Sequence, residues 1–175
     1  MNEQQSIRAC KEGNLDAFEN LYLMYVAEIF RFLHYRVKNK DRAEDLTQDT
    51  FLKALKGIGG FKDGVSFRPW LYQIARNVLI DHYRAHHDTI SLDDDDVSDV
   101  ADWHNLEQEA DAKYTLAQVQ EALDALPSLQ RDIVIMRVWD GLSYGEIAEI
   151  VGKTEGNCKM IFFRAVTRLK DMVPL

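Results

Sequence analysis

The 175 residues are enough for one domain or two small ones, and a hydrophobic content of 46% is sufficient for packed cores. No run approaches the ~18 apolar residues of a membrane span, and residues 1–14 lack the apolar core of a secretion signal, so we expect a cytoplasmic protein without membrane insertion. The two distant cysteines, Cys10 and Cys158, exclude a disulfide framework and a zinc-binding pattern.

The net charge of −8 is concentrated in one short segment. Residues 91–112 contain nine acidic residues and no Lys or Arg, whereas residues 1–90 contain 13 basic and 12 acidic residues, and residues 113–175 contain eight of each. The acidic segment predicts a solvated, flexible linker between two domains. Each domain can still present a basic surface, so the total charge does not exclude a nucleic-acid partner.

Three prolines, nine glycines and few alternating β-branched runs favour an all-α fold, made of two small helical domains. We expect a short amphipathic helix before Asn14 and then a long helix over residues 14–37. The apolar stripe of this long helix comprises Leu15, Phe18, Leu21, Tyr22, Tyr25, Ile29, Phe32 and Leu33.

Two more helices complete the predicted first domain. Asp41 with Glu44 resembles a capping pair that opens a helix ending near Gly57. After a loop, Ser66 can cap a third helix that continues to about Arg84.

The second domain is predicted to begin with a helix from about Lys113 that Pro127 ends. Ser128 can cap the next helix. The apolar positions of these two helices are Leu116, Val119, Leu123 and Leu126 in the first, and Ile133, Val134, Met136 and Val138 in the second.

Residues 143–170 have the pattern of a helix-turn-helix with a basic second helix. Ser143 and Glu146 form a capping box, Gly152 suits the left-handed turn, and Thr154 can cap the second helix. Apolar residues lie on one side of each helix, at Ile147, Ala148 and Val151 and then at Cys158, Phe162, Ala165 and Leu169. From Lys153 to Lys170 there are five basic residues and one acid, which suits the phosphates of a DNA groove.

An aromatic cluster surrounds the entry of the third predicted helix, at Phe61, Phe67, Trp70 and Tyr72. Cations are interleaved with these rings, which is typical of surfaces that stack unpaired bases. The same rings could instead close a three-helix core, and the pattern leaves both interpretations open.

Three blocks of the sequence, residues 43–56, 61–84 and 126–156, together resemble the signature blocks of extracytoplasmic-function (ECF) sigma factors. These bacterial transcription initiation factors contain only sigma regions 2 and 4. The resemblance implies region 2 at 1–90 and region 4 at 113–175. It also implies three partners, namely core RNA polymerase through its β′ clamp helices and β flap, promoter DNA, and an anti-sigma factor.

The resemblance implies a role for each matching residue. The residues that it implies contact polymerase are Asp45, Leu46, Gln48 and Phe51. Binding of the minus-10 element falls to Phe61, Phe67, Trp70, Arg76, Asn77 and Arg84. Binding of the minus-35 element falls to Lys153, Thr154, Asn157, Lys159, Met160, Phe163 and Arg164.

The second helix of the helix-turn-helix departs from the family, which usually has a small polar residue at Met160 and an Arg at Ile161. Met160 and Phe163 are expected to face outward, where they could contact thymine methyl groups or an apolar protein surface, and we favour DNA. The acidic linker is either a solvated tether or, as the family implies, a segment that threads through the polymerase.

Two other functions are compatible with parts of the sequence. A DNA-binding regulator could use the helix-turn-helix without polymerase, and a metal-dependent nuclease could use the run Asp93–Asp96. No histidine lies near a nucleophile or a ligand set of useful spacing, so we expect no enzymatic activity, no metal site and no cofactor. The hypothesis is therefore a sigma factor that directs core RNA polymerase to promoters and begins their melting.

Overall fold

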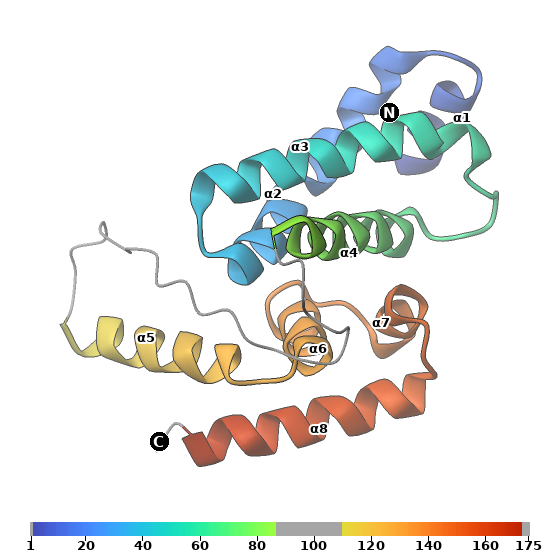
Figure 1. Cartoon of the computed structure of the whole chain (residues 1–175). Helices are drawn as coiled ribbons and strands as arrows, with labels where there is room; N and C mark the ends of the chain where they lie inside the picture. The colour runs from blue at the N-terminus through green and yellow to red at the C-terminus, as the bar shows by residue number, and fades with distance from the viewer. Residues whose placement is uncertain (1, 87–109, 173–175) are drawn as a thin grey trace. The chain divides into compact units, whose positions relative to one another are not determined.

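A computed structural model describes residues 2–86 and 110–172, with side chains from residue 117 onward in the second part. The described residues form α-helices and two short 3₁₀ helices and include no β-strand (Figure 1). The predicted all-α fold with two helical domains is confirmed. The chain divides into one compact unit up to Asp88 and another from Thr89. Most of the predicted linker lies outside the described residues, and none of the described helices is long and apolar enough to cross a membrane.

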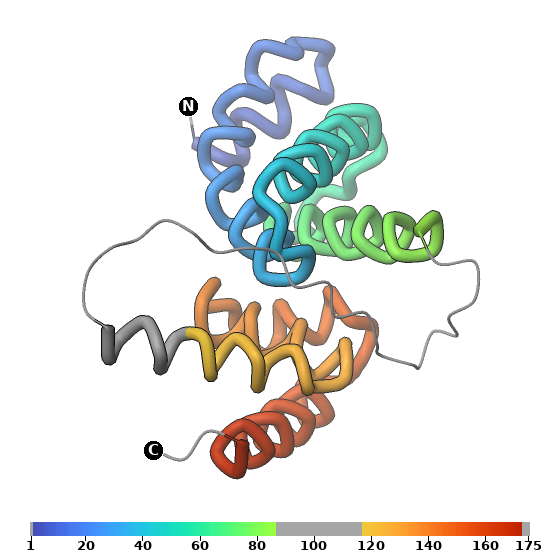
Figure 2. The backbone as a smooth tube through the Cα atoms, turned by 60° about the vertical axis from the view of Figure 1, so that its left-hand side comes forward, coloured from blue at the N-terminus to red at the C-terminus, as the bar shows by residue number. Residues whose placement is uncertain are grey.

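The first unit contains four α-helices and two 3₁₀ turns within residues 2–86, which Figure 2 follows from blue to green. They are α1 (Glu3–Lys11), η1 (Leu15–Ala17), α2 (Phe18–Val37), α3 (Lys40–Gly57), η2 (Ile58–Gly60) and α4 (Phe67–His86). Helices α2, α3 and α4 pack against one another, and α1 packs against α2. The short helix expected before Asn14 is present.

The core of the first unit is formed by apolar side chains from the three long helices. Its largest fully buried side chains are Leu21, Ile29, Phe32, Leu33, Phe67, Leu71, Tyr72 and Leu79. Burial of one such side chain stabilises the fold by about 1.5–3 kcal/mol. Leu15 is instead 60% exposed, because it lies in η1, before the buried face of α2 begins.

The caps of the first unit differ in part from the prediction. Asn2 and Gln5 form a capping box at α1. Helix α3 is capped by Asn39, whose side chain accepts a hydrogen bond from the backbone of Arg42 at 2.9 Å. The prediction of Asp41 as the cap is wrong, since the cap lies two residues earlier, at Asn39, and α3 begins at Lys40, which places Asp41 inside its first turn.

The second unit contains α5 (Ala110–Asp124), α6 (Ser128–Val138), α7 (Tyr144–Val151) and α8 (Glu155–Met172). Helix α8 packs against the other three. Its core cluster comprises Leu123, Leu126, Val134 and Ala165, with Val119, Trp139, Phe162 and Leu169 packed against it. Two details of the prediction are wrong: Pro127, not Ser128, is the N-cap residue of α6, and Val138 is exposed because it ends that helix.

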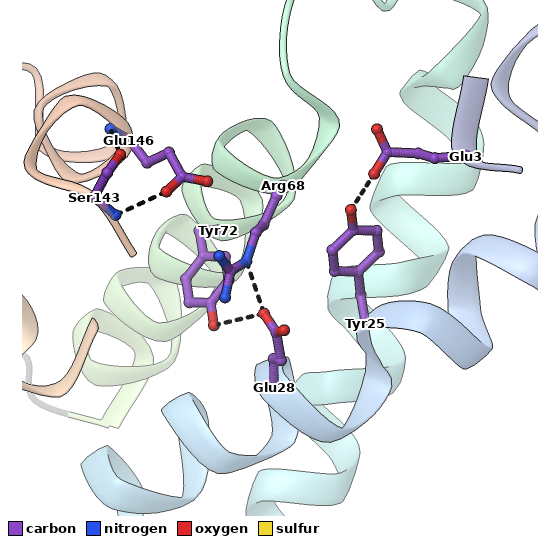
Figure 3. A network of polar contacts seen from close by, with 7 residues as sticks. All are labelled: Glu3, Tyr25, Glu28, Arg68, Tyr72, Ser143 and Glu146. Atoms are coloured by element: carbon purple, nitrogen blue, oxygen red, sulfur yellow. Dashed lines mark hydrogen bonds and ion pairs between the residues drawn. The ribbon is translucent and has the colours of Figure 1, made fainter. Parts of the chain in front are cut away.

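The helix-turn-helix has the predicted local structure. Ser143 and Glu146 form a reciprocal capping box (Figure 3). Gly152 ends α7 with φ 68°, in the left-handed region that favours glycine. Thr154 accepts a hydrogen bond from the backbone of Asn157 at 3.2 Å, as expected for the start of α8.

Candidate nucleic-acid interface

Three rings of the first unit pack together where α4 begins. The ring centroids of Phe61 and Phe67 lie 5.0 Å and 5.4 Å from that of Trp70, and 5.7 Å from each other. Phe61 and Phe67 are buried, as is Tyr72, whereas Trp70 is half-buried. The core interpretation therefore holds for Phe61 and Phe67, and Trp70 is the ring that retains an accessible surface.

The position of Trp70 is fixed from a second side by the end of α3. A Cβ atom placed on Gly57 would lie only 3.3 Å from Cζ2 of Trp70, so the absence of a side chain at Gly57 allows this close approach. The loop that precedes α4 is tied to α1, because Lys11 Nζ lies 2.7 Å from the carboxylate of Asp63. This hydrogen bond and ion pair lower the pKa of Asp63.

Helix α4 aligns Trp70 with two polar residues. Trp70, Asn77 and Arg84 are spaced by seven residues, which is close to two helical turns, so they lie along one face of the helix. Asn77 and Arg84 are exposed, and Arg76, which is half-buried, points about 100° away from Asn77. We call Trp70, Asn77 and Arg84 the α4 row.

Arg68, which the sequence places among the rings, is engaged inside the unit. Its Nε donates to the Glu28 carboxylate at 2.9 Å, and the Tyr72 hydroxyl donates to the same oxygen at 3.4 Å (Figure 3). Both charged side chains are mostly buried. Arg68 therefore joins α4 to α2 and is not a candidate for phosphate binding.

The four residues predicted to contact polymerase separate into two groups. Asp45 and Gln48 are exposed on α3, whereas Leu46 and Phe51 are buried. The Phe51 ring packs edge-on against Tyr22 and Phe18 of α2, at 4.8 Å and 6.3 Å between centroids. Leu46 and Phe51 are therefore core residues that hold α3 in place, and they cannot themselves contact polymerase at the surface.

The exposed face of α3 also includes an apolar residue, Leu52, that is not among the predicted contact residues. Leu52 is 53% exposed and follows Asp45 and Gln48 at the spacing of seven and four residues that places side chains on one helix face. The sequence offers one signal of this exposure, because Leu52 lies outside the apolar stripe of α3. We call Asp45, Gln48 and Leu52 the α3 face.

In the second unit, the structure exposes every residue predicted to contact the minus-35 element. These residues are Lys153, Thr154, Asn157, Lys159, Met160, Phe163 and Arg164. The opposite side of α8 is buried, since Cys158 and Ala165 are inaccessible. Burial raises the pKa of the Cys158 thiol, in keeping with an apolar core role.

Tyr144 at the start of α7 lies between two cations. The Arg137 guanidinium lies 4.6 Å and the Lys159 ammonium 5.7 Å from its ring centroid. Lys159 also pairs with Glu155 at 3.4 Å, one turn earlier on α8. Lys159 is therefore directed toward α7, and the side of α8 that includes Met160, Phe163 and Arg164 has no acidic residue between them.

Among the residues whose side chains the structure describes, no three His, Cys, Asp or Glu side chains lie together in a way that could hold a metal ion. The run Asp93–Asp96, considered for a nuclease, lies outside the described residues.

Residues 21–89 match the family Sigma-70 region 2, and residues 116–169 match Sigma-70, region 4. The chain is a member of the sigma-70 family, in its ECF group. It is 34% identical over 170 residues to the ECF RNA polymerase sigma factor BldN of Streptomyces coelicolor, covering 96% of this chain and 64% of BldN. It is 33% identical over 155 residues to the ECF RNA polymerase sigma factor SigM of Bacillus subtilis, covering 88% of this chain and 93% of SigM.

Solved structures share the fold of this sigma factor. CnrH, in complex with the cytosolic domain of CnrY, superimposes with a TM-score of 0.75 at 21% identity, covering 97% of this chain and 96% of CnrH. The sigma factor RpoE from Bartonella quintana, in complex with the anti-sigma factor NepR, gives a TM-score of 0.67 at 27% identity, covering 89% of this chain and 95% of RpoE. Sigma factors catalyse no reaction themselves, so membership of this family argues against the nuclease hypothesis.

Proposed function

We propose that this sigma factor directs core RNA polymerase to specific promoters, with its first domain opening the minus-10 element and its second binding the minus-35 element. The observation that carries the proposal is the α4 row. It combines a ring with an accessible surface, an exposed amide and an exposed cation on one face of a helix. An unpaired base needs these groups, because the ring can stack on it and the cation can hold its phosphate.

The energetics explain why polymerase is required. Taking a base out of a duplex costs a few kcal/mol, and stacking on an aromatic side chain returns about 1–3 kcal/mol per base. One accessible tryptophan cannot keep a promoter open by itself. A regulator acting alone should bind promoter DNA tightly, whereas this sigma factor should bind it poorly until it is attached to polymerase.

The α3 face is our candidate for attachment to the β′ clamp helices, with Asp45 and Gln48 as polar contacts and Leu52 as an apolar one. An apolar side chain flanked by polar groups is typical of protein interfaces, where the centre is buried and the rim stays polar. The second domain would contact the β flap as well as the upstream DNA.

Transcription in vitro tests this function most directly. Purified core polymerase is incubated with genomic templates, with and without the sigma factor, and the start sites are mapped. Initiation at defined sites only in its presence is expected. Failure to initiate on any genomic template would refute the proposal.

We also propose an anti-sigma partner and a cytoplasmic location. The sigma factor RpoE, which is 27% identical to this chain, was solved in complex with the anti-sigma factor NepR. A protein that acts on polymerase and promoter DNA works in the bacterial cytoplasm.

A further inference from the structure

The exposed side of α8 contains two large apolar side chains that the described residues of the second unit leave accessible. Met160 is 54% exposed and Phe163 is 65% exposed, although burial of either side chain would be favourable. They are three residues apart and therefore neighbours on the helix surface. Phe163 also packs edge-on against Phe162, with 6.1 Å between centroids, so its ring is supported from the helix side.

Basic residues surround this apolar pair. Arg164 is adjacent to Phe163, Lys153 and Arg168 lie before and after the pair, and Glu155 is already paired with Lys159. A protein partner that covered Met160 and Phe163 would have to be acidic around an apolar centre. A DNA groove supplies the same negative charge from its phosphates, and its major groove is wide enough for a helix.

Neither Met160 nor Phe163 can form the hydrogen bonds that distinguish most base edges. The one apolar group in the major groove is the C5-methyl of thymine. Along the helix axis the two residues are separated by about 4.5 Å, which is comparable to the ~3.4 Å between base pairs. The two side chains can therefore reach methyl groups on neighbouring base pairs.

We infer that Met160 and Phe163 recognise thymine methyl groups of the minus-35 element, and that they set the sequence preference of the second domain. This inference rests on the proposed function, because it requires α8 to enter the promoter groove. Arg164 then holds a phosphate or a guanine edge beside the methyl contacts, and the preference among bases comes mainly from apolar contact.

Deoxyuridine tests the inference, because it lacks only the methyl group and keeps every hydrogen-bonding group of thymine. On a promoter whose start site has been mapped, each thymine of the upstream element is replaced by deoxyuridine, one at a time and on both strands. Binding of the holoenzyme, core polymerase with the full chain, is measured for each duplex. We expect one or two replacements to weaken binding about fourfold, the factor expected for one buried methyl group.

The variants Met160→Ser and Phe163→Ser show which side chain contacts which thymine methyl group. Each should abolish the sensitivity to deoxyuridine at one position, and both residues are exposed, so the second domain should remain folded. Met172→Ser, an exposed methionine near the end of the same helix, should keep the wild-type pattern.

Three outcomes would overturn the inference. If transcription is normal but no replacement weakens binding, or the upstream element has no thymine, α8 does not recognise methyl groups. If Met160→Ser and Phe163→Ser weaken binding while the deoxyuridine pattern is unchanged, the two side chains contact a protein surface instead. If no template is transcribed, the proposed function fails as well, and that result is distinct from the first two.

Discussion

Replacement of Trp70 by alanine should have two separate effects: it should lower the stability of the first domain, and it should lower the population of the open complex. A fully buried tryptophan replaced by alanine costs about 3–5 kcal/mol, and Trp70 is half-buried, so we expect the Trp70→Ala substitution to cost the first domain about 2–3 kcal/mol. Loss of one stacked base should cost a further 1–3 kcal/mol in the open complex, or roughly 5- to 150-fold in its population. Closed-complex formation should change little, because the α3 face is intact.

The assay compares closed complexes, trapped at low temperature, with open complexes, detected by the reactivity of unpaired thymines at the minus-10 element. Phe32→Leu is the matched control, because Phe32 is fully buried, contacts Tyr72 and lies in α2, away from the α4 row. It should lower the stability of the first domain while leaving the ratio of open to closed complexes unchanged. Equal loss of both complexes in Trp70→Ala would refute the strand-trapping role.

Three further predictions concern other parts of the molecule. Arg164→Ala should weaken binding of the holoenzyme to promoters that contain the upstream element, because a phosphate or guanine contact is lost; unchanged binding across a promoter series would mean that α8 serves another partner. Arg68→Met should lower the free energy of unfolding by about 1–2 kcal/mol, because it leaves the mostly buried Glu28 carboxylate without its 2.9 Å ion pair; a denaturation curve identical to wild type would contradict this. Burial lowers the pKa of His34, so the unfolded chain takes up a proton at higher pH than the folded one. Stability should therefore fall as the pH drops through about 6.5, and His34→Phe should reduce that fall; parallel pH profiles of wild type and variant would show that His34 has no part in it.

Local signals predicted the helix-turn-helix well. The capping box at Ser143, the left-handed Gly152 and the cap at Thr154 each depend on residues within one turn of the chain, so the sequence contains the whole cause. The same reasoning placed the cap of α3 at Asp41 when Asn39 performs that role. Helix α2 ends at Val37 with Lys38 in the left-handed region, and the backbone is extended at Asn39, so α3 begins directly after Asn39 and not after Asp41.

Burial of the aromatic cluster was not predictable from the sequence. Phe61, Phe67 and Trp70 have similar chemistry and lie within ten residues, yet only Trp70 retains accessible surface. The difference arises from contacts that are distant in the chain, since α2 covers Phe67 through Tyr25 and α3 approaches Trp70 at Gly57. Phe51 follows the same rule, because its ring is buried against Phe18 and Tyr22 of α2. Family resemblance assigns a role to a position but does not say whether the side chain acts at the surface or from the core.

Each surface that would meet DNA is modest by itself. The α4 row presents one accessible ring, and α8 presents two apolar side chains, each sufficient for a discrimination of about fourfold per methyl contact. Both domains are attached to one polymerase, so once one domain has bound its promoter element, binding of the other domain is intramolecular. The modest sequence preferences of the two domains therefore multiply. A promoter with a strong minus-10 element should therefore tolerate Phe163→Ser, whereas a promoter with a weak one should lose most of its activity. This dependence on context distinguishes a two-domain initiation factor from a regulator whose helix-turn-helix must supply all of its affinity.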